Sequence, residues 1–346
     1  MRLLLYPFAL LMLAVVSMRN MFYNKGVFKS RSFAKPIICV GNLSVGGTGK
    51  SPIVIYLAKL LSTHLKVATL SRGYGRKTTG FRQVSISDNT THVGDEPLMF
   101  ANELPAVNVF VGEDRCAAID TILGNHPSTQ TIILDDAMQH RKVKAGLYIL
   151  LTRFSDPFWH DHLLPAGNLR EPANSAARAQ LVVITNCPSS MSDSDRSAIR
   201  KKAIKYTSAE VFFSTVKYQT PHDLFGVNTW KGKYDSLLCV SGIANPTAFH
   251  QHASAYAVHT QNMVYSDHHE FSEKDLKNIK KNFDSLSGEK AILVTAKDKV
   301  RLAASPSCLN MLNEIKAVFY QPIEFSILDD PKRFDQLILQ YAQTHS

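Results

Sequence analysis

A glycine-rich segment at residues 44–51 constrains the fold of this chain more than any other feature. It reads Ser-Val-Gly-Gly-Thr-Gly-Lys-Ser and lies between the apolar run Pro36–Val40 and Lys50–Leu61, where apolar residues recur at helical spacing. A glycine-rich turn between a buried strand and a helix is the context of a phosphate-binding loop, because backbone N–H groups and the helix dipole converge there on an anion. The alternative is a glycine-rich turn that binds nothing.

The residues of this loop have separate predicted roles. Lys50 is expected to reach the β- and γ-phosphates of a nucleotide, and the Ser51 hydroxyl to hold Mg²⁺. Two positions depart from known patterns: Ser44 replaces the usual first glycine, and Val45 replaces the signature lysine of partition-type ATPases. The predicted nucleotide-binding residues are Ser44, Val45, Gly46, Gly47, Thr48, Gly49, Lys50 and Ser51.

Short apolar runs alternate with helical stretches along the first two thirds of the chain. Apolar residues make up 45% of the sequence, enough for proper cores, which excludes a wholly disordered chain. The alternation predicts an α/β fold with a doubly wound, mostly parallel sheet like that of P-loop NTPases. Besides Pro36–Val40, the predicted strands are Val67–Leu70, Val107–Val111, Thr131–Leu134, Leu147–Thr152 and Leu181–Thr185.

The character of the sequence changes between residues 211 and 236. Val211–Thr220 and Trp230–Tyr234 are predicted to form the two strands of a β-ribbon. A second α/β rhythm follows and ends in a helix near Pro331–Ala342. The predicted organisation is an N-terminal membrane-anchor helix with its basic flank at 1–30, a P-loop core at 31–212, a β-ribbon linker at 213–236 and a smaller α/β domain at 237–346.

The amino terminus is apolar and then basic. Leu3–Met18 is uncharged, and residues 1–87 contain 13 Lys and Arg but no Asp or Glu. A membrane anchor is favoured, because cations after an apolar helix suit anionic headgroups and leave the body of the protein on the cytoplasmic side. A cleaved signal peptide and a buried core helix are the alternatives. The basic segment would also suit nucleic acid, but no recognition motif accompanies it, so we expect no nucleic-acid partner.

The five cysteines give no sign of a disulfide scaffold or a zinc site. They stand at positions 39, 116, 187, 239 and 308, an odd number with no CxxC pair. Reduced thiols in the cytosol are the simplest interpretation.

Two acidic pairs are candidates for chemistry. Asp135 and Asp136 follow a buried apolar strand, as the Mg²⁺-binding aspartate of a Walker B strand does. An ordinary strand followed by an acidic turn is the alternative. Asp95 and Glu96 precede Pro97, so one of them would otherwise serve as a helix cap.

A third cluster, Asp267-His268-His269-Glu270, lies far along the chain. A histidine beside a carboxylate can shuttle protons, although a solvated loop or an adventitious metal site would show the same local pattern. Nothing in the local spacing distinguishes these alternatives.

Together the motifs resemble the tetraacyldisaccharide 4′-kinase family, the kinases of lipid A synthesis. The resemblance covers most of the chain, in the order of the family's motifs. The matching stretches are GNLSVGGTGKSP (41–52), LSRGYGRK (70–77), VGDEP (93–97), ILDDAMQH (133–140), LLPAGNLREP (163–172), SGIANP (241–246), DHHEF (267–271) and TAKD (295–298).

The resemblance implies an ATP- and Mg²⁺-dependent enzyme at the cytoplasmic face of the inner membrane. Its members transfer the γ-phosphate of ATP to the 4′-hydroxyl of a tetraacylated glucosamine disaccharide 1-phosphate, which forms lipid IVA. No obligate protein partner is implied. A P-loop NTPase of the partition or metal-chaperone kind is the alternative function.

By the same resemblance, each motif supplies a role. Asp95 would pair with His268 to accept the proton of the sugar hydroxyl, and Lys50 would complete the catalytic set. Arg170 and Glu171 would lie on a mobile segment over the nucleotide. The predicted metal-organising residues are Ser51, Glu96, Asp135, Asp136 and Gln139.

Three departures from the family pattern fall near these residues. Ala137 replaces the glycine of the DDG-x-QH motif, and Asn168 replaces a proline before the Leu-Arg-Glu-Pro stretch. Residues 159–162 read Trp-His-Asp-His in place of a short Asn-Gly turn. These departures concern the shape of the 155–172 segment and not the chemistry.

Overall fold

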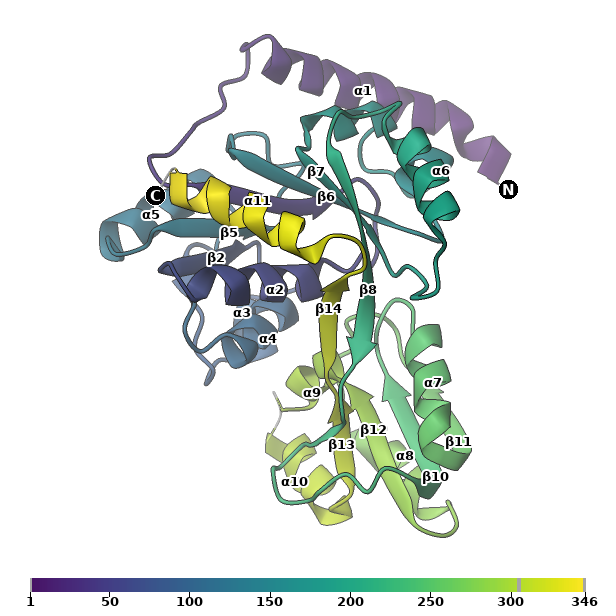
Figure 1. The fold of residues 1–346 in the computed structure, drawn as a ribbon. Helices are drawn as coiled ribbons and strands as arrows, with labels where there is room; N and C mark the ends of the chain where they lie inside the picture. Colours follow the sequence, from purple (N-terminus) through teal and green to yellow (C-terminus); the bar gives the residue numbers. More distant parts are fainter. Residues whose placement is uncertain (1, 304–305, 345–346) are drawn as a thin grey trace.

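Two β-sheets organise the chain in the computed structural model, which describes residues 2–303 and 306–344 (Figure 1). The larger sheet has nine strands in the order β14-β8-β7-β6-β1-β5-β2-β4-β3, and only its β3–β4 and β14–β8 pairs are antiparallel. Its strands are β1 Ile37–Asn42, β2 Val67–Ser71, β3 Arg82–Gln83, β4 Asn108–Val111, β5 Thr131–Asp135, β6 Leu147–Arg153, β7 Leu181–Thr185, β8 Glu210–Tyr218 and β14 Ile323–Ile327.

The central strands of this sheet are buried along their whole length. They read as continuous apolar runs because helices cover both faces of a parallel sheet. The six predicted strands are confirmed to within two residues at each end. The helices of this unit are α2 Lys50–Ser62, α3 Thr90–Val93, α4 Asp95–Glu103, α5 Arg115–Asn125, α6 Asp193–Ala203 and α11 Pro331–Thr344, with 3₁₀ turns η2 Phe158–His160 and η3 Ala173–Arg178.

The smaller sheet has the order β11-β10-β12-β13-β9, with only β9 antiparallel to its neighbour. Its interior strands are apolar and its helices pack on the two faces, so it has a core of its own. Its elements are β9 His222–Asp223, β10 Tyr234–Ser241, α7 Thr247–Ala253, η4 Ser254–Tyr256, β11 Ala257–Val264, α8 Glu273–Asp284, β12 Lys290–Thr295, α9 Ala296–Ala303, α10 Pro306–Ile315 and β13 Val318–Gln321.

A two-stranded ribbon joins the two units, but its second strand is not the predicted one. β8 pairs antiparallel with β14, and Tyr218 stands opposite Ile323 (Figure 1). Residues 230–233 form no strand: Gly232 has a φ of 87°, which turns the chain, and the Trp230 ring packs 5.0 Å from the ring of Phe319 in the smaller unit. Aromatic packing therefore outweighs the strand propensity of this stretch.

The carboxy-terminal helix belongs to the large unit, which corrects the boundary predicted at 237–346. After β14 the chain returns to the first sheet, where α11 buries Phe334, Ile338 and Ala342 in the same core as α2. The smaller unit is therefore an insertion between β8 and β14. Helical periodicity predicted α11 correctly, but it carries no information about which sheet the helix covers.

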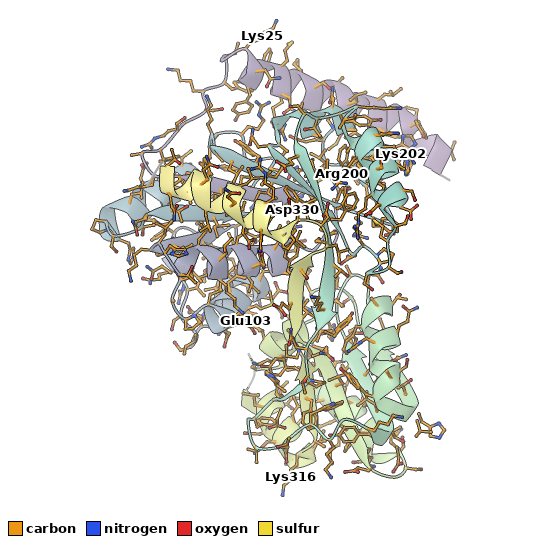
Figure 2. All side chains as sticks on the ribbon, viewed as in Figure 1. Lys25, Glu103, Arg200, Lys202, Lys316 and Asp330 are labelled. Atoms are coloured by element: carbon orange, nitrogen blue, oxygen red, sulfur yellow. The ribbon has the colours of Figure 1, made fainter. Side chains whose placement is uncertain are left out.

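The amino-terminal helix α1, Tyr6–Asn24, follows the 3₁₀ turn η1, Arg2–Leu5, and lies across the large unit at the end far from the smaller one (Figure 1). It is long and apolar enough to be a candidate membrane span, and only 11% of its apolar window is buried. That exposure contradicts the alternative of a buried core helix. Lys25, just after α1, and Lys316 of the smaller unit mark opposite ends of the molecule (Figure 2).

Candidate active site

The glycine-rich loop connects β1 to α2 at the carboxyl edge of the large sheet. Gly46 and Gly49 have φ angles of 90° and 82°, a backbone region that favours glycine. The Thr185 hydroxyl, at the end of β7, donates to the Thr48 carbonyl at 2.9 Å and holds the loop against the sheet. The strand–loop–helix context predicted for a phosphate loop is therefore present.

Two elements, α2 and β6, each place a cation at this loop. The Lys50 ammonium is 3.8 Å from a carboxylate oxygen of Asp136, and its side chain is largely buried. Arg153, at the end of β6, lies so close to Gly46 that a Cβ there would be 2.9 Å from its guanidinium. Sequence reasoning missed Arg153, since one arginine after an apolar strand carries no distinctive signal.

The two aspartates after β5 point to different partners. Asp136 has a φ of 48° and accepts hydrogen bonds from the Arg170 guanidinium at 2.8 and 3.2 Å. Asp135 accepts a hydrogen bond from Ser71 at 3.3 Å on one oxygen, and its other oxygen is buried with no partner among the described residues. Burial, followed by the negative charges of Glu96 and Asp136, raises the pKa of Asp135 to about 7.

Ser51 and Glu96 connect the loop to α4. The Ser51 hydroxyl donates to Glu96 at 2.8 Å, and Lys297 of the smaller unit donates to the same carboxylate oxygen at 2.7 Å. Burial opposes ionisation of Glu96, but the charge of Lys297 outweighs it and lowers the pKa of that carboxyl.

Asp95 and His268 meet across the two units. Nδ1 of His268 lies 2.9 Å from a carboxylate oxygen of Asp95, although 173 positions separate them in the sequence. The hydrogen bond that the Asp95 carboxylate accepts from His268 is the main cause that raises the pKa of His268. Burial opposes ionisation of Asp95, but the hydrogen bond to His268 and the charges of Arg301 and Lys297 hold its pKa well below the usual value.

Arg301 joins Asp95 and His268 as the third residue of this cluster. The sequence analysis did not predict it. Its guanidinium, only 3% exposed, donates to Asp95 through Nε at 3.1 Å and also through Nη2. It also donates to Asp298 at 3.0 Å. The sequence signal for Lys297 and Arg301 is weak. It is a Lys and an Arg four positions apart after the buried strand β12, and that pattern is common on exposed helices.

The 155–172 segment lies along the phosphate loop. The Val45 N–H donates to the Asn168 carbonyl at 2.8 Å, and the Arg170 N–H donates to the Leu43 carbonyl at 2.6 Å. Ser44 and Leu169 form an isolated β-bridge. Arg170 thus lies beside the phosphate loop.

Glu171 is not placed over the loop as predicted. Its carboxylate is 1% exposed, points toward α1 and accepts hydrogen bonds from Arg19 at 2.6 Å and from Arg178. Arg170 and Glu171 thus have different partners: the Arg170 guanidinium is held by Asp136 and the Glu171 carboxylate by Arg19 and Arg178.

Gln139 is a half-buried residue near the end of β1. Its nitrogen donates to the Asn42 carbonyl at 2.9 Å, and its oxygen has no partner among the described residues. Within residues 2–303 and 306–344, no group of three or more His, Cys, Asp or Glu side chains forms a ready metal cage. Mg²⁺ does not need one, because it keeps several waters and binds through one or two carboxylates and the phosphates of its substrate.

Comparison with known proteins identifies the family of this chain. The family profile described as Tetraacyldisaccharide-1-P 4'-kinase matches residues 1–343. The tetraacyldisaccharide 4'-kinase of Flavobacterium psychrophilum is 40% identical, over 98% of this chain and 96% of that protein. The enzyme of the same name from Phocaeicola vulgatus is 38% identical, over 99% of this chain and 95% of that protein.

A solved structure has the same architecture. It is LpxK from Aquifex aeolicus, described as the apo form in complex with ATP, with a TM-score of 0.75 and 28% identity over 98% of this chain and 99% of that one. The P-loop α/β fold expected from the sequence is confirmed. A phosphate loop, paired acidic residues and a full-length match in sequence and fold lead to one conclusion: this chain belongs to the tetraacyldisaccharide-1-P 4'-kinase family.

Proposed function

We propose that this chain transfers the γ-phosphate of ATP to the 4′-hydroxyl of a tetraacylated glucosamine disaccharide 1-phosphate and forms lipid IVA. The observation that carries the proposal is the pair Asp95–His268, joined at 2.9 Å across the two units next to a phosphate loop. A nucleotide-hydrolysing switch needs no such proton acceptor for an alcohol. The relatives that bear the kinase name match 98–99% of this chain and 95–96% of their own length, which supports the same activity here.

In phosphoryl transfer the protein chiefly positions the reacting groups and neutralises the charge of the phosphates. Lys50 and the loop N–H groups would bind the β- and γ-phosphates, and Arg170 would hold the neighbouring Asp136 in place. The dyad would take the proton of the sugar hydroxyl, a contribution of roughly 10²–10⁴-fold in rate. Asp95 would hold the imidazole and stabilise its protonated form, while Arg301 fixes Asp95.

The residues at the loop fit a Mg²⁺ ion. Asp135 has a buried, unpartnered carboxylate oxygen and a raised pKa, both of which a nearby cation would relieve, and the Ser51 hydroxyl stands at the start of α2. Asp135 and Ser51 would hold the ion, with Glu96 and Gln139 beside them. When bound, the ion neutralises phosphate charge.

The acceptor and the location follow from the family and from α1. A lipid-linked sugar lies at a membrane surface, and α1 presents exposed apolar side chains such as Phe8 and Leu11. The cations after α1 suit an anionic cytoplasmic leaflet, which supports a location on the cytoplasmic face of the inner membrane.

An assay of ³²P transfer from ATP to the acylated disaccharide 1-phosphate in detergent micelles tests the proposal. We expect product only with ATP, Mg²⁺ and the lipid acceptor together, and ADP release that depends on the acceptor. ADP release at an equal rate without the acceptor would instead indicate an NTPase of the partition or metal-chaperone kind.

A further inference from the structure

The amino-terminal helix contacts the segment that borders the phosphate loop. The Arg19 guanidinium donates to Glu171 at 2.6 Å, and the Asn20 amide donates to the Ser175 hydroxyl at 3.4 Å. Nearer the start of the helix, the Tyr6 ring meets the ring of His162 edge-on at 5.3 Å. These three contacts of α1 all fall between residues 162 and 175.

The same segment holds the phosphate loop on its other side. Two backbone hydrogen bonds tie it to the loop, from Val45 to Asn168 at 2.8 Å and from Arg170 to Leu43 at 2.6 Å. The Arg170 guanidinium continues to Asp136 at 2.8 Å. Arg170 and Glu171 are adjacent, so two ion pairs, Arg19–Glu171 and Arg170–Asp136, connect α1 to an aspartate of the site.

Burial makes the Arg19–Glu171 pair more than a surface contact. Glu171 is 1% exposed, and a buried carboxylate needs the cations that face it. Arg178 approaches its other oxygen, so Glu171 is held between one cation from α1 and one from η3. Removal of Arg19 leaves one oxygen of a buried carboxylate without its charged partner.

We propose that Arg19 is a positioning residue: through Glu171 it fixes Arg170 against Asp136 and the phosphate loop, so that docking of α1 sets the geometry of the active site. Anchoring alone requires only the exposed apolar face of α1. The Arg19 side chain is 38% exposed, but its guanidinium is paired with a buried glutamate, a contact that anchoring does not need. The inference rests on the kinase function proposed above.

The matched variants are Arg19→Gln and Lys29→Gln. Both remove one cation from the amino-terminal basic region, but Lys29 is exposed and lies outside α1. We expect Arg19→Gln to lower kcat about tenfold, because small misplacements of an active-site group have effects of that size or larger. The KM for the lipid and co-sedimentation with anionic phospholipid vesicles stay at wild-type values. Lys29→Gln keeps the wild-type kcat, and Arg19→Lys recovers part of the loss.

Amide hydrogen exchange gives a second readout that needs no activity. In Arg19→Gln, peptides covering 43–45 and 168–171 should exchange faster, because their mutual hydrogen bonds open more often. Lys29→Gln should leave them unchanged. Wild-type exchange and kcat in Arg19→Gln would overturn the inference, as would a loss confined to lipid KM and vesicle binding. A wild-type protein without kinase activity would count against the proposed function, and exchange would still decide the role of Arg19.

Discussion

Asp95 and Asp135 are both buried carboxylates, yet their pKa values move in opposite directions. Asp95 faces His268 and Arg301, so its pKa is low despite burial. Burial, together with the negative charges of Glu96 and Asp136, raises the pKa of Asp135 to about 7. The first suits a group that stays charged to orient an imidazole, and the second suits a group that awaits a cation.

Lys50→Ala should abolish phosphoryl transfer, because Lys50 is the cation of the phosphate loop. The protein should stay folded, because the Lys50 side chain is not part of a hydrophobic core. Lys59→Ala is the matched control on the same helix, where the side chain is 58% exposed and 3.9 Å from its nearest acidic partner. Steady-state kinetics and thermal melting of both variants check this. Near-normal turnover by folded Lys50→Ala would contradict the assignment of the phosphate loop.

The pH profile should depend on Asp95. His268 must be neutral to accept a proton, and its pKa is raised above the usual 6.5, chiefly by the hydrogen bond to Asp95. Activity should therefore fall as the pH drops through a value above 6.5. Asp95→Asn removes the negative charge, so the acid limb of kcat against pH should move to lower pH while kcat falls. An acid limb at the same pH in Asp95→Asn would show that Asp95 does not tune His268.

Local sequence patterns predicted most residues of the loop and its acidic neighbours, since these follow strand ends directly. They did not predict Arg301 or the orientation of Glu171. Arg301 reaches Asp95 across 206 positions, and the direction of Glu171 depends on where α1 docks. Neither contact can be predicted from the residues near it in the sequence.

At the level of elements, the strands and helices were predictable but their assignment to sheets was not. The apolar runs identified the central strands of the large sheet, because each is buried on both faces. The partner of β8 and the sheet that α11 covers depend on the return of the chain after residue 322. Such long-range pairing has no periodic signal in a single sequence.

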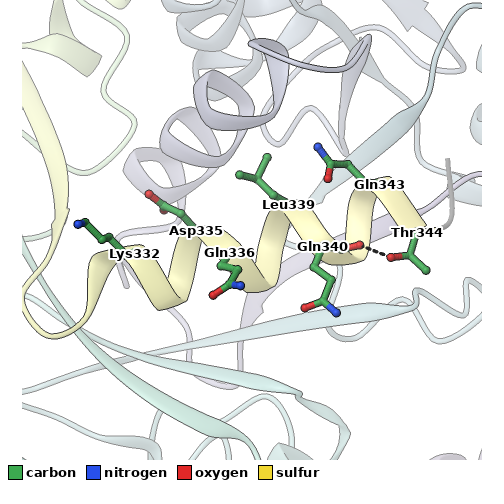
Figure 3. Close-up of a pocket in the computed structure, with 7 residues that line it drawn as sticks. All are labelled: Lys332, Asp335, Gln336, Leu339, Gln340, Gln343 and Thr344. Atoms are coloured by element: carbon green, nitrogen blue, oxygen red, sulfur yellow. Dashed lines mark hydrogen bonds between the residues drawn. The ribbon is translucent and has the colours of Figure 1, made fainter.

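Phe334→Ala tests the corrected place of α11. This ring is fully buried in the core of the large unit, so its truncation should cost about 3–5 kcal/mol of that unit's stability. Gln336→Ala is the control. Gln336 lies on the outer face of the same helix and lines a surface pocket (Figure 3). Its substitution should change the free energy of unfolding by less than about 0.5 kcal/mol.

The two tryptophans of the chain report on the two units separately. Trp159 packs in the large unit and Trp230 in the smaller one. In urea unfolding of single-tryptophan proteins, Phe334→Ala should shift the Trp159 transition more than the Trp230 transition. A larger shift at Trp230 would place α11 with the smaller unit after all.

At the scale of the whole molecule, α1 lies at one end and the smaller unit at the other (Figure 1). The site includes residues of both the large and the smaller unit. Deletion of residues 1–22 should release the protein from anionic vesicles and weaken its use of lipid substrate, because the exposed apolar face of α1 is lost. Vesicle co-sedimentation at high salt checks this. Retention of the truncated protein on vesicles would place the anchor elsewhere.

The central claim is that the site is assembled across the two units by Asp95 and His268. Steady-state kinetics of Asp95→Ala, His268→Ala and the double variant test it most directly. We expect each single variant to lower kcat by roughly 10²–10⁴-fold and the double to be little worse than the worse single, because residues that act as a unit are not additive. ATP binding should survive in all three. Fully additive losses, or a wild-type kcat in His268→Ala, would contradict the account.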